Sequence, residues 1–529
     1  MADSKKYMDK LFKGFMLPDR FPLIAVNTFF AGYFFSENGL AAFSFILPIY
    51  FLFIVAGFAI NFGAFSLTVK SVSQSEAEAA RKFSSSALIL SCATGIILAA
   101  AVNIFFEPLL KLFGVPQELY PLVEIYGRLM GAAGFFLVIS LYILQFLKLF
   151  GMQQQLKKVY KIMLVLNAAV GYSLIKFFNF GLEALAISMI IALIFCIIFE
   201  GLQLHKRVGK NLFAPLKFSE IQIAEILTAG SSITLSKIFS LSQILMYNYF
   251  LFQIFGVTGV AAFASLQIAI RICRTASGMT LQGITPILTV EYGDKNLAAM
   301  LLLFKTAIRR GLIMSILPMA VLLIFTEKFA HTPLAVDAFR MYALSLIPAA
   351  INAIMITIFL TLGHVKFSNF LAFMRSFALL ILVLKFAPEY VWWSFLFAEI
   401  VTLIILICGG VILSKKENLK TPLLIDAKKF QPTTYFVVNR EKGLTADQRQ
   451  KISAFQSNCV EVVEKILSLS NAHSNEKKNN FTAVQITRAG ETLELVARSN
   501  GKLFDYKNLI PADWNFKFVL GLNNFYVKL

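Results

Sequence analysis

Apolar segments long enough to cross a lipid bilayer follow one another along most of this chain, and they constrain its fold more than any other feature. A helix needs about 20 mostly apolar residues to cross a hydrocarbon core of about 30 Å. Only 15% of the 529 residues are charged, which is too few for an ordinary soluble surface. We therefore predict an all-α polytopic membrane protein with twelve transmembrane helices. The predicted spans are 14–36, 40–69, 83–107, 119–147, 157–178, 181–204, 222–254, 257–291, 297–325, 334–362, 364–386 and 390–413.

Lys and Arg residues are concentrated in alternate loops between these spans. Twenty lie on the side of the N-terminus and five lie on the opposite side. Because positive residues are retained on the cytoplasmic side, this bias predicts an even number of spans with both termini in the cytoplasm. It also accounts for the net charge of +19 without nucleic acid as a partner. The expected location is the inner membrane, and the expected partner is the lipid bilayer.

The two halves of the predicted membrane part resemble each other. The sequence Gly-Leu-Ala-Ala-Phe at 39–43 returns as Gly-Val-Ala-Ala-Phe at 259–263, and the same offset of 220 carries Gly63 onto Gly283. Each copy opens the second span of a six-span half, so both halves share one orientation. Such a parallel repeat places the working cavity between the halves. The predicted lobes are residues 1–213 and 214–413.

The composition changes abruptly after Leu413. Residues 414–529 carry 18 Lys and Arg and 11 Asp and Glu, and they contain no spanning segment. We predict a linker at 414–432 and a small cytoplasmic α+β domain at 433–529. Its expected elements are a strand at 435–438, a helix from Ala446 to about Leu469 capped by Thr445, and a hairpin formed by 481–487 and 491–498.

Ionisable groups inside predicted spans are costly, so each one is a candidate for function. The second lobe carries Lys237, Arg271, Arg274 and Arg375 in its spans. Arg271 and Arg274 are three residues apart and therefore share one face of a helix. One interpretation is that these side chains snorkel toward the interface or lie at helix ends. The other is a positively charged cavity that suits an anionic or phosphate-bearing amphiphile, because Arg binds such groups well.

Two acidic residues in the spans are candidates for ion coupling. Glu124 lies four residues before Arg128, a spacing at which the two side chains can neutralise each other. Glu399 is the best remaining titratable group for a proton-linked step. Three amides in apolar segments suggest either cavity lining or interhelical hydrogen bonds, namely Asn27, Asn167 and Asn248.

No pattern in the sequence points to catalysis. There is no nucleophile–base pair, no intact phosphate-binding loop and no His or Cys cluster with metal-ligand spacing. We therefore expect no enzyme activity, no catalytic residue, no metal site and no cofactor. A proton or sodium gradient is the expected driving force.

The membrane part resembles the multidrug and toxin extrusion (MATE) family. Residues 26–32, 37–42 and 48–51 resemble the first two helices of that family, and the similarity extends in collinear order over about residues 14–413. Further matching stretches are 112–116, 166–167, 181–186 and 283–286. The resemblance implies two six-helix lobes and alternating access coupled to sodium or protons. It also implies antiport that exports small amphipathic solutes or drugs.

The carboxylates that the family uses for coupling have no counterparts here. Asn27 stands where the first helix of the family usually carries Asp, and Gly171 replaces the acid one turn after Asn167. The acid of the seventh helix is also missing, and the nearest charge is that of Lys237. Two alternatives to an exporter therefore stay open. One is a flippase for an anionic lipid-linked precursor, and the other is a membrane-embedded sensor that signals through the tail.

The tail resembles, more weakly, a histidine-kinase-like ATP-binding domain of the anti-sigma-factor type. The resemblance rests on the helix with Glu461, the hairpin after it and the run 500–505. The Asp that reads adenine and the Asn that holds magnesium in that family correspond to Ser499 and Lys465. The resemblance therefore implies a degenerate nucleotide site at Glu461, Ser499 and Gly501, with a regulatory or docking role toward a cytoplasmic protein. The alternative is an unrelated α+β domain.

Overall fold

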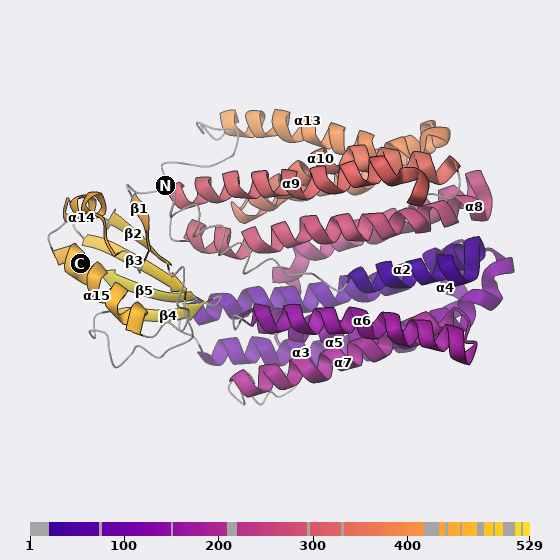
Figure 1. Cartoon of the computed structure of the whole chain (residues 1–529), viewed down its shortest axis with the longest axis horizontal. Coiled ribbons are helices and arrows are strands. Elements are labelled where there is room, and N and C mark those ends of the chain that lie inside the picture. Colours follow the sequence, from indigo (N-terminus) through magenta and orange to yellow (C-terminus); the bar gives the residue numbers. More distant parts are fainter. Residues whose placement is uncertain are drawn as a thin grey trace.

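The computed structural model shows a large helical part and a small α+β domain at one end of it (Figure 1). The structure describes residues 21–73, 77–149, 152–208, 220–293, 297–329, 333–416, 433–439, 443–454, 458–472, 481–489, 492–500, 514–519 and 522–528. The start of the first predicted span, 14–20, lies outside these ranges.

The predicted spans correspond closely to observed helices. The first half contains α2 (Phe21–Ser73), α3 (Ala77–Ile104), α4 (Phe106–Leu112), η1 (Gln117–Leu119), α5 (Tyr120–Leu149), α6 (Gln153–Phe178) and α7 (Glu183–Val208). The second half contains α8 (Ile223–Gly293), α9 (Leu297–Phe329), α10 (Pro333–Thr361), α11 (Val365–Phe373), η4 (Met374–Ala378), α12 (Leu379–Phe386), η5 (Pro388–Tyr390) and α13 (Trp393–Lys416). The short element η4 is one turn of π-helix.

The two longest helices each contain one residue with a non-helical backbone. Ser36 in α2 has φ 55° and ψ −153°, and Gly256 in α8 has φ 63° and ψ −151°. These residues are 220 positions apart, which is the offset of the sequence repeat, so the two halves share a backbone feature as well as a motif. Both breaks lie where a span was predicted to end.

Within the described residues, ten helices are long and apolar enough to cross a membrane. This confirms a multi-pass membrane protein. Division of α2 and α8 at Ser36 and Gly256 would give the twelve predicted segments, and the count of twelve stays a prediction.

The helices form two groups that meet along one seam. Helices α3 and α5 to α7 pack against α2, whereas α9 to α11 pack against α8. Helix α13 packs on α10 and α12, and α2 lies against α8. The seam allows very close approach, because a Cβ atom on Gly63 would lie 2.0 Å from the Ile226 carbonyl oxygen and one on Gly230 would lie 2.2 Å from the Ala59 carbonyl oxygen. Two glycines therefore let the backbones of α2 and α8 touch.

We use two names for the ends of the helical part. The tail-side end is the one where α2 finishes near Ser73, α8 begins near Ile223 and α9 begins at Leu297. The far end is the opposite one, where α2 and α8 are interrupted at Ser36 and Gly256.

The tail is a five-stranded antiparallel sheet with two helices on one face. Its strands lie in the order β1-β2-β3-β5-β4. The elements are β1 (Thr433–Asn439), α14 (Ala446–Ser453), α15 (Asn458–Ala472), β2 (Phe481–Ala489), β3 (Thr492–Asn500), β4 (Asn515–Val519) and β5 (Leu522–Lys528).

Local signals in the tail sequence are largely confirmed. Thr445 forms a capping box with Gln448, and β2 pairs with β3 as the predicted hairpin. The prediction of one helix from Ala446 to Leu469 is wrong, because α14 ends at Ser453 and α15 begins at Asn458. Two shorter helices let Ile452 and Ile466 both enter the core of this domain.

Candidate functional site

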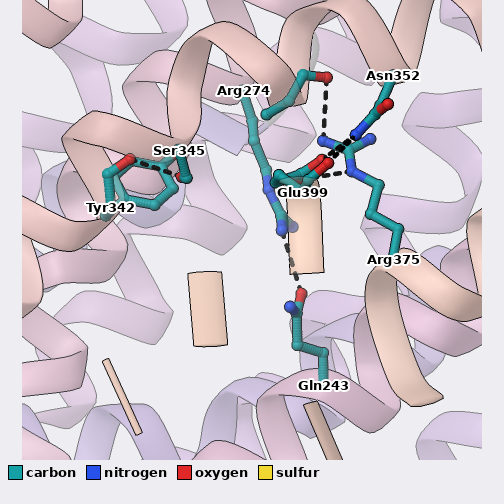
Figure 2. Close-up of polar contacts among 8 residues, drawn as sticks. Gln243, Arg274, Tyr342, Ser345, Asn352, Arg375 and Glu399 are labelled. Carbon is teal, nitrogen blue, oxygen red and sulfur yellow. Dashed lines mark hydrogen bonds and ion pairs between the residues drawn. The ribbon is translucent and has the colours of Figure 1, made fainter. Parts of the chain in front are cut away.

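A buried group of polar side chains lies in the second lobe between α10, η4 and α13. Arg375 donates from Nε to Glu399 Oε1 at 2.5 Å, and Asn352 donates from Nδ2 to Glu399 Oε2 at 2.9 Å. The same Asn352 amide also donates to the Glu399 backbone oxygen at 2.8 Å. Figure 2 shows Arg375 and Asn352 both directed at Glu399. The carboxylate therefore has a partner on each oxygen.

Arg375 belongs to a π-helical turn. The turn Met374–Ala378 lies between α11 and α12 and widens the helix locally, as π-turns at functional sites often do. Arg375 also donates from Nη2 to the Ala349 oxygen at 3.3 Å, so α13 and α10 both hold its guanidinium. The Arg375 side chain is 25% exposed and that of Glu399 is 12% exposed, so water screens this ion pair only weakly.

Arg274 lies next to this group but has a different kind of partner. Its Nη2 donates to Gln243 Oε1 at 3.1 Å, a contact between the two halves of α8 (Figure 2). Gln243 is neutral, so this hydrogen bond does not compensate the charge of Arg274. Two guanidinium groups and one carboxylate leave one positive charge in excess among Arg274, Arg375 and Glu399. The arrangement suits an anion.

Aromatic rings border the cluster. Tyr247 stacks on Phe395 with ring centroids 4.9 Å apart, and Tyr342 meets Phe395 edge-on at 5.6 Å. The hydroxyl of Tyr247 hydrogen-bonds to that of Ser394 at 2.5 Å. Tyr247, Tyr342 and Phe395 are only 1%, 6% and 8% exposed, so the rings pack closely against one another beside the charged group.

The other two predicted cations lie on the seam between the lobes. The Arg271 guanidinium is 4.7 Å from the centre of the Phe51 ring, and Lys237 Nζ is 4.5 Å from the centre of the Phe58 ring. Arg271 is 1% exposed and donates from Nη2 to Gln267 at 2.8 Å. Both cations come from α8 and both rings come from α2, so cation–π contacts join the lobes here.

The position of Arg271 follows from the repeat. An offset of 220 carries Phe51 onto Arg271, so equivalent positions of the two halves contact each other. Such a pair must lie near the pseudo-two-fold axis that relates the halves. The structure therefore separates the four predicted cations into Lys237 and Arg271 at the seam and Arg274 and Arg375 in the second-lobe cluster.

The amides of the first lobe form a neutral chain of hydrogen bonds. Ser188 donates to Asn167 Oδ1 at 3.2 Å, Asn167 donates to Asn27 Oδ1 at 2.8 Å, and Asn27 donates to the Leu185 oxygen at 3.0 Å. Asn27 and Asn167 are 1% and 0% exposed. This chain links α2, α6 and α7 and agrees with the interhelical hydrogen bonding that we considered.

Asn248 and Glu124, two further candidates from the sequence, each form a hydrogen bond or an ion pair with another side chain. Asn248 in α8 accepts from Ser44 Oγ at 2.8 Å and donates to the Ser44 backbone oxygen at 2.7 Å, which joins the lobes nearer the far end. Glu124 and Arg128 form the expected ion pair at 3.4 Å, with side chains 58% and 38% exposed. Their ion-coupling and cavity-lining roles stay predictions.

The tail residues do not assemble into a described site. Glu461 is exposed on α15, Ser499 lies on β3, and Gly501 falls outside the described residues. Lys465 lies 5.6 Å from the centre of the Trp514 ring. Among the residues with described placement, no group of three or more His, Cys, Asp or Glu could hold a metal ion.

Several site residues escaped the sequence analysis. Asn352, Gln243 and Gln267 are neutral, so the search for charge within spans did not single them out. Phe51 and Phe58 lie among 54 phenylalanines. A signal for Phe51 was nevertheless present, because the repeat offset places it opposite a charged residue.

Taken together, the fold and the cluster define a multi-pass membrane protein with two related helical lobes and charged side chains among the helices of the second lobe. Residues 23–173 match the model of the MatE family. Members of that family are transporters and not enzymes, in agreement with the prediction that this chain is no enzyme. A search of curated proteins finds no match.

Solved structures of MATE transporters share the fold of the helical part. One is the inward-facing conformation of a multidrug resistance MATE family transporter of the MOP superfamily, with 17% identity, coverage of 75% of this chain and 95% of that chain, and a TM-score of 0.64. An outward-facing conformation of such a transporter also matches, with 17% identity, 78% and 97% coverage and a TM-score of 0.64.

A third structure comes from Pyrococcus furiosus and is described by the words "reverse polarity of binding pocket suggests different function of a MOP superfamily transporter". It is 17% identical, covers 79% of this chain and 97% of that chain, and has a TM-score of 0.65. The comparisons lend no support to a histidine-kinase-like fold for the tail, and that resemblance remains a hypothesis.

Proposed function

We propose that this protein is a secondary transporter that exports a small amphipathic solute, preferentially an anionic one, by rocking its two lobes. The observation that carries the proposal is the excess positive charge of Arg274, Arg375 and Glu399 beside the Tyr247–Phe395 stack. A lipophilic cation would be repelled by this charge, whereas a carboxylate or phosphate would be attracted. The Pyrococcus furiosus structure, described as having a binding pocket of reverse polarity, makes a departure from the common cargo of this fold reasonable.

The proposed location is the inner membrane with both termini in the cytoplasm, which follows from the distribution of Lys and Arg among the loops. We propose a proton or sodium gradient as the driving force. Glu399 is the better candidate for a proton-linked step, because protonation of its carboxyl would weaken the bond to Arg375 and increase the positive charge of the cluster. Glu124, which is more exposed, is the second candidate.

Two other functions retain specific support. A flippase for an anionic lipid-linked precursor would use the same positive cluster and would need no coupling carboxylate at Asn27. A sensor would need a path from the membrane part to the tail, and the tail sheet contacts α2 and α9. If the protein is a sensor, a cytoplasmic protein partner would bind the tail. A nucleotide site at Glu461, Ser499 and Gly501 would then be degenerate.

Uptake into vesicles tests the proposal. Purified protein in proteoliposomes should accumulate anionic amphipathic dyes more than cationic ones under an imposed proton or sodium gradient. Arg274→Gln should reduce anion uptake by at least about tenfold, since it removes the charge without a counter-ion. Arg340→Gln is the matched control, because Arg340 is 49% exposed and pairs with Glu327 at 3.7 Å away from the cluster. A preference for cations would refute the anionic cargo, and full activity of Arg274→Gln would refute the site.

The same vesicles separate the alternatives. A flippase would move a fluorescent polyprenyl phosphate between leaflets and would leave water-soluble dyes outside. A sensor would transport none of these probes under any gradient.

A further inference from the structure

The sheet of the tail has two apolar faces, and its own helices cover only one of them. Phe436 and Val438 on β1 point to the face that packs on α14 and α15, where they join Ile452 and Ile466. Because side chains alternate along a strand, Val437 between them must point to the other face. An apolar side chain on that face must pack against residues outside α14 and α15 to be buried.

The end of the second lobe provides this cover. Val437 pairs in register with Ala483 on β2, and the two side chains are only 2% and 3% exposed. They belong to one buried apolar cluster with Met300 and Phe304 of α9, and β1 lies against α9. The core of the second lobe therefore continues into the tail without a polar layer between them.

The first lobe reaches the same place. Phe65 of α2 packs against the cluster that contains Val437 and Ala483, and strand β4 also contacts α2. Figure 1 shows the tail against this end of the helices. The domain thus contacts both lobes and not only the second lobe, from which the chain enters it.

The lobes themselves are in close contact at this level. Gly63, which lies two residues before Phe65, and Gly230 bring the backbones of α2 and α8 together. Any motion that separates the lobes at the tail-side end must break this contact and must also pull β1 away from α9 or β4 away from α2.

We propose that the domain of residues 433–528 is a clamp that holds the tail-side ends of the two lobes together. Opening at this end then requires the sheet to leave one of the lobes, and departure from the second lobe exposes Val437 and Ala483 to water. The clamp makes opening less favourable and gives a cytoplasmic ligand of the tail a means to control it. The inference rests on the proposed rocking of the lobes.

Distance measurements in the full-length protein test the clamp without a cargo. Spin labels at Lys206→Cys and Lys366→Cys report the separation of α7 and α11 at the tail-side end, where both side chains are exposed. The background carries alanine in place of the five native cysteines. Val437→Asp places a charge in the apolar contact and should shift the ratio of long to short distances by about tenfold or more. Gln450→Asp, which adds the same charge on the exposed face of α14, should leave the distances unchanged.

A second measurement monitors the fold of the tail. In the protein with native cysteines, Cys459 is fully buried and should resist alkylation as long as the domain is folded. If Val437→Asp unfolds the tail, the clamp is lost as well, and the distances must still lengthen. Tyr435→Ala provides a milder change on the same face and should give a smaller shift in the same direction.

The outcomes distinguish the clamp from the transport mechanism. Unchanged distances in Val437→Asp and Tyr435→Ala overturn the clamp, provided that the unmodified protein shows both short and long distances as pH or detergent is varied. A single fixed distance in every variant and condition overturns the rocking mechanism itself, and with it both proposals.

Discussion

A methyl group added at Gly63 should separate the two lobes. The Cβ of alanine at this position would lie 2.0 Å from the Ile226 oxygen and 2.9 Å from the Gly230 nitrogen, and both of these are backbone atoms that no rotamer change can move. Ordinary contact begins near 3.4 Å, so α2 and α8 must move apart by about 1.4 Å at this point. Overpacking of this kind costs about 1–3 kcal/mol, and we expect Gly63→Ala near the upper end.

Thermal unfolding in detergent and the distance between labelled lobes measure this effect. Gly63→Ala should lower the melting temperature and lengthen the distance between the lobes at the tail-side end. Gly201→Ala is the matched control, since the nearest atom to its new Cβ is Ile143 Cδ1 at 3.9 Å. That change fills open space within a helix and should be neutral or slightly stabilising. Equal melting temperatures and equal distances for both variants would refute the close contact between α2 and α8.

Three further predictions concern other parts of the molecule. Arg375→Met should destabilise the second lobe by about 2–3 kcal/mol, because it leaves the poorly exposed Glu399 carboxylate without its cation. A double-mutant cycle with Glu399→Gln should show a coupling free energy above about 1 kcal/mol, and additive effects would contradict the ion pair. Ser36→Gly should stabilise the protein by about 1 kcal/mol, since φ 55° with ψ −153° strains any residue except glycine, and a lower melting temperature would count against that strain. Burial raises the pKa of the Cys459 thiol above its ordinary value of 9.0. The contribution of this thiol to the stability of the tail is therefore fully present below pH 9.0 and should decrease as the pH rises above that value. A Cys459 alkylation rate that follows pH like that of a free thiol would disprove this.

The cluster in the second lobe differs in kind from the first-lobe amide chain. Asn27 and Asn167 satisfy each other with neutral hydrogen bonds, and they carry no charge that a gradient could titrate. Glu399 lies between a cation and an amide, so its protonation would change the charge that a cargo meets. We therefore propose that recognition and coupling both reside in the second lobe.

Much of the architecture could be predicted from local patterns. Apolar length determines where helices can span, and the charge of the loops indicates their orientation, because both are properties of single segments in a bilayer. The offset of 220 also relates Ser36 to Gly256, which share one backbone shape, although the structure was needed to single out these two residues. The Thr445 cap and the hairpin at 481–500 were readable for the same reason, whereas the break between α14 and α15 was not, since the domain core decides it.

The sequence did not predict the contacts of individual charged residues in the second lobe. Lys237, Arg271, Arg274 and Arg375 looked alike as charges in apolar segments, yet two face rings of the other lobe and two lie near Glu399. Their partners come from helices far away in the chain, and the packing of those helices selects them.

The amino-acid sequence by itself determined the membrane class, the two related halves and the separate tail, since these follow from hydropathy, charge and repetition along the chain. Only the tertiary structure decided that Glu399 binds Arg375 and that Arg274 turns to Gln243. It alone also decided that the tail sheet lies across the ends of both lobes. The physical reason is that a segment's partition into lipid depends on its own composition, whereas a contact depends on which surfaces the whole fold brings within a few ångströms.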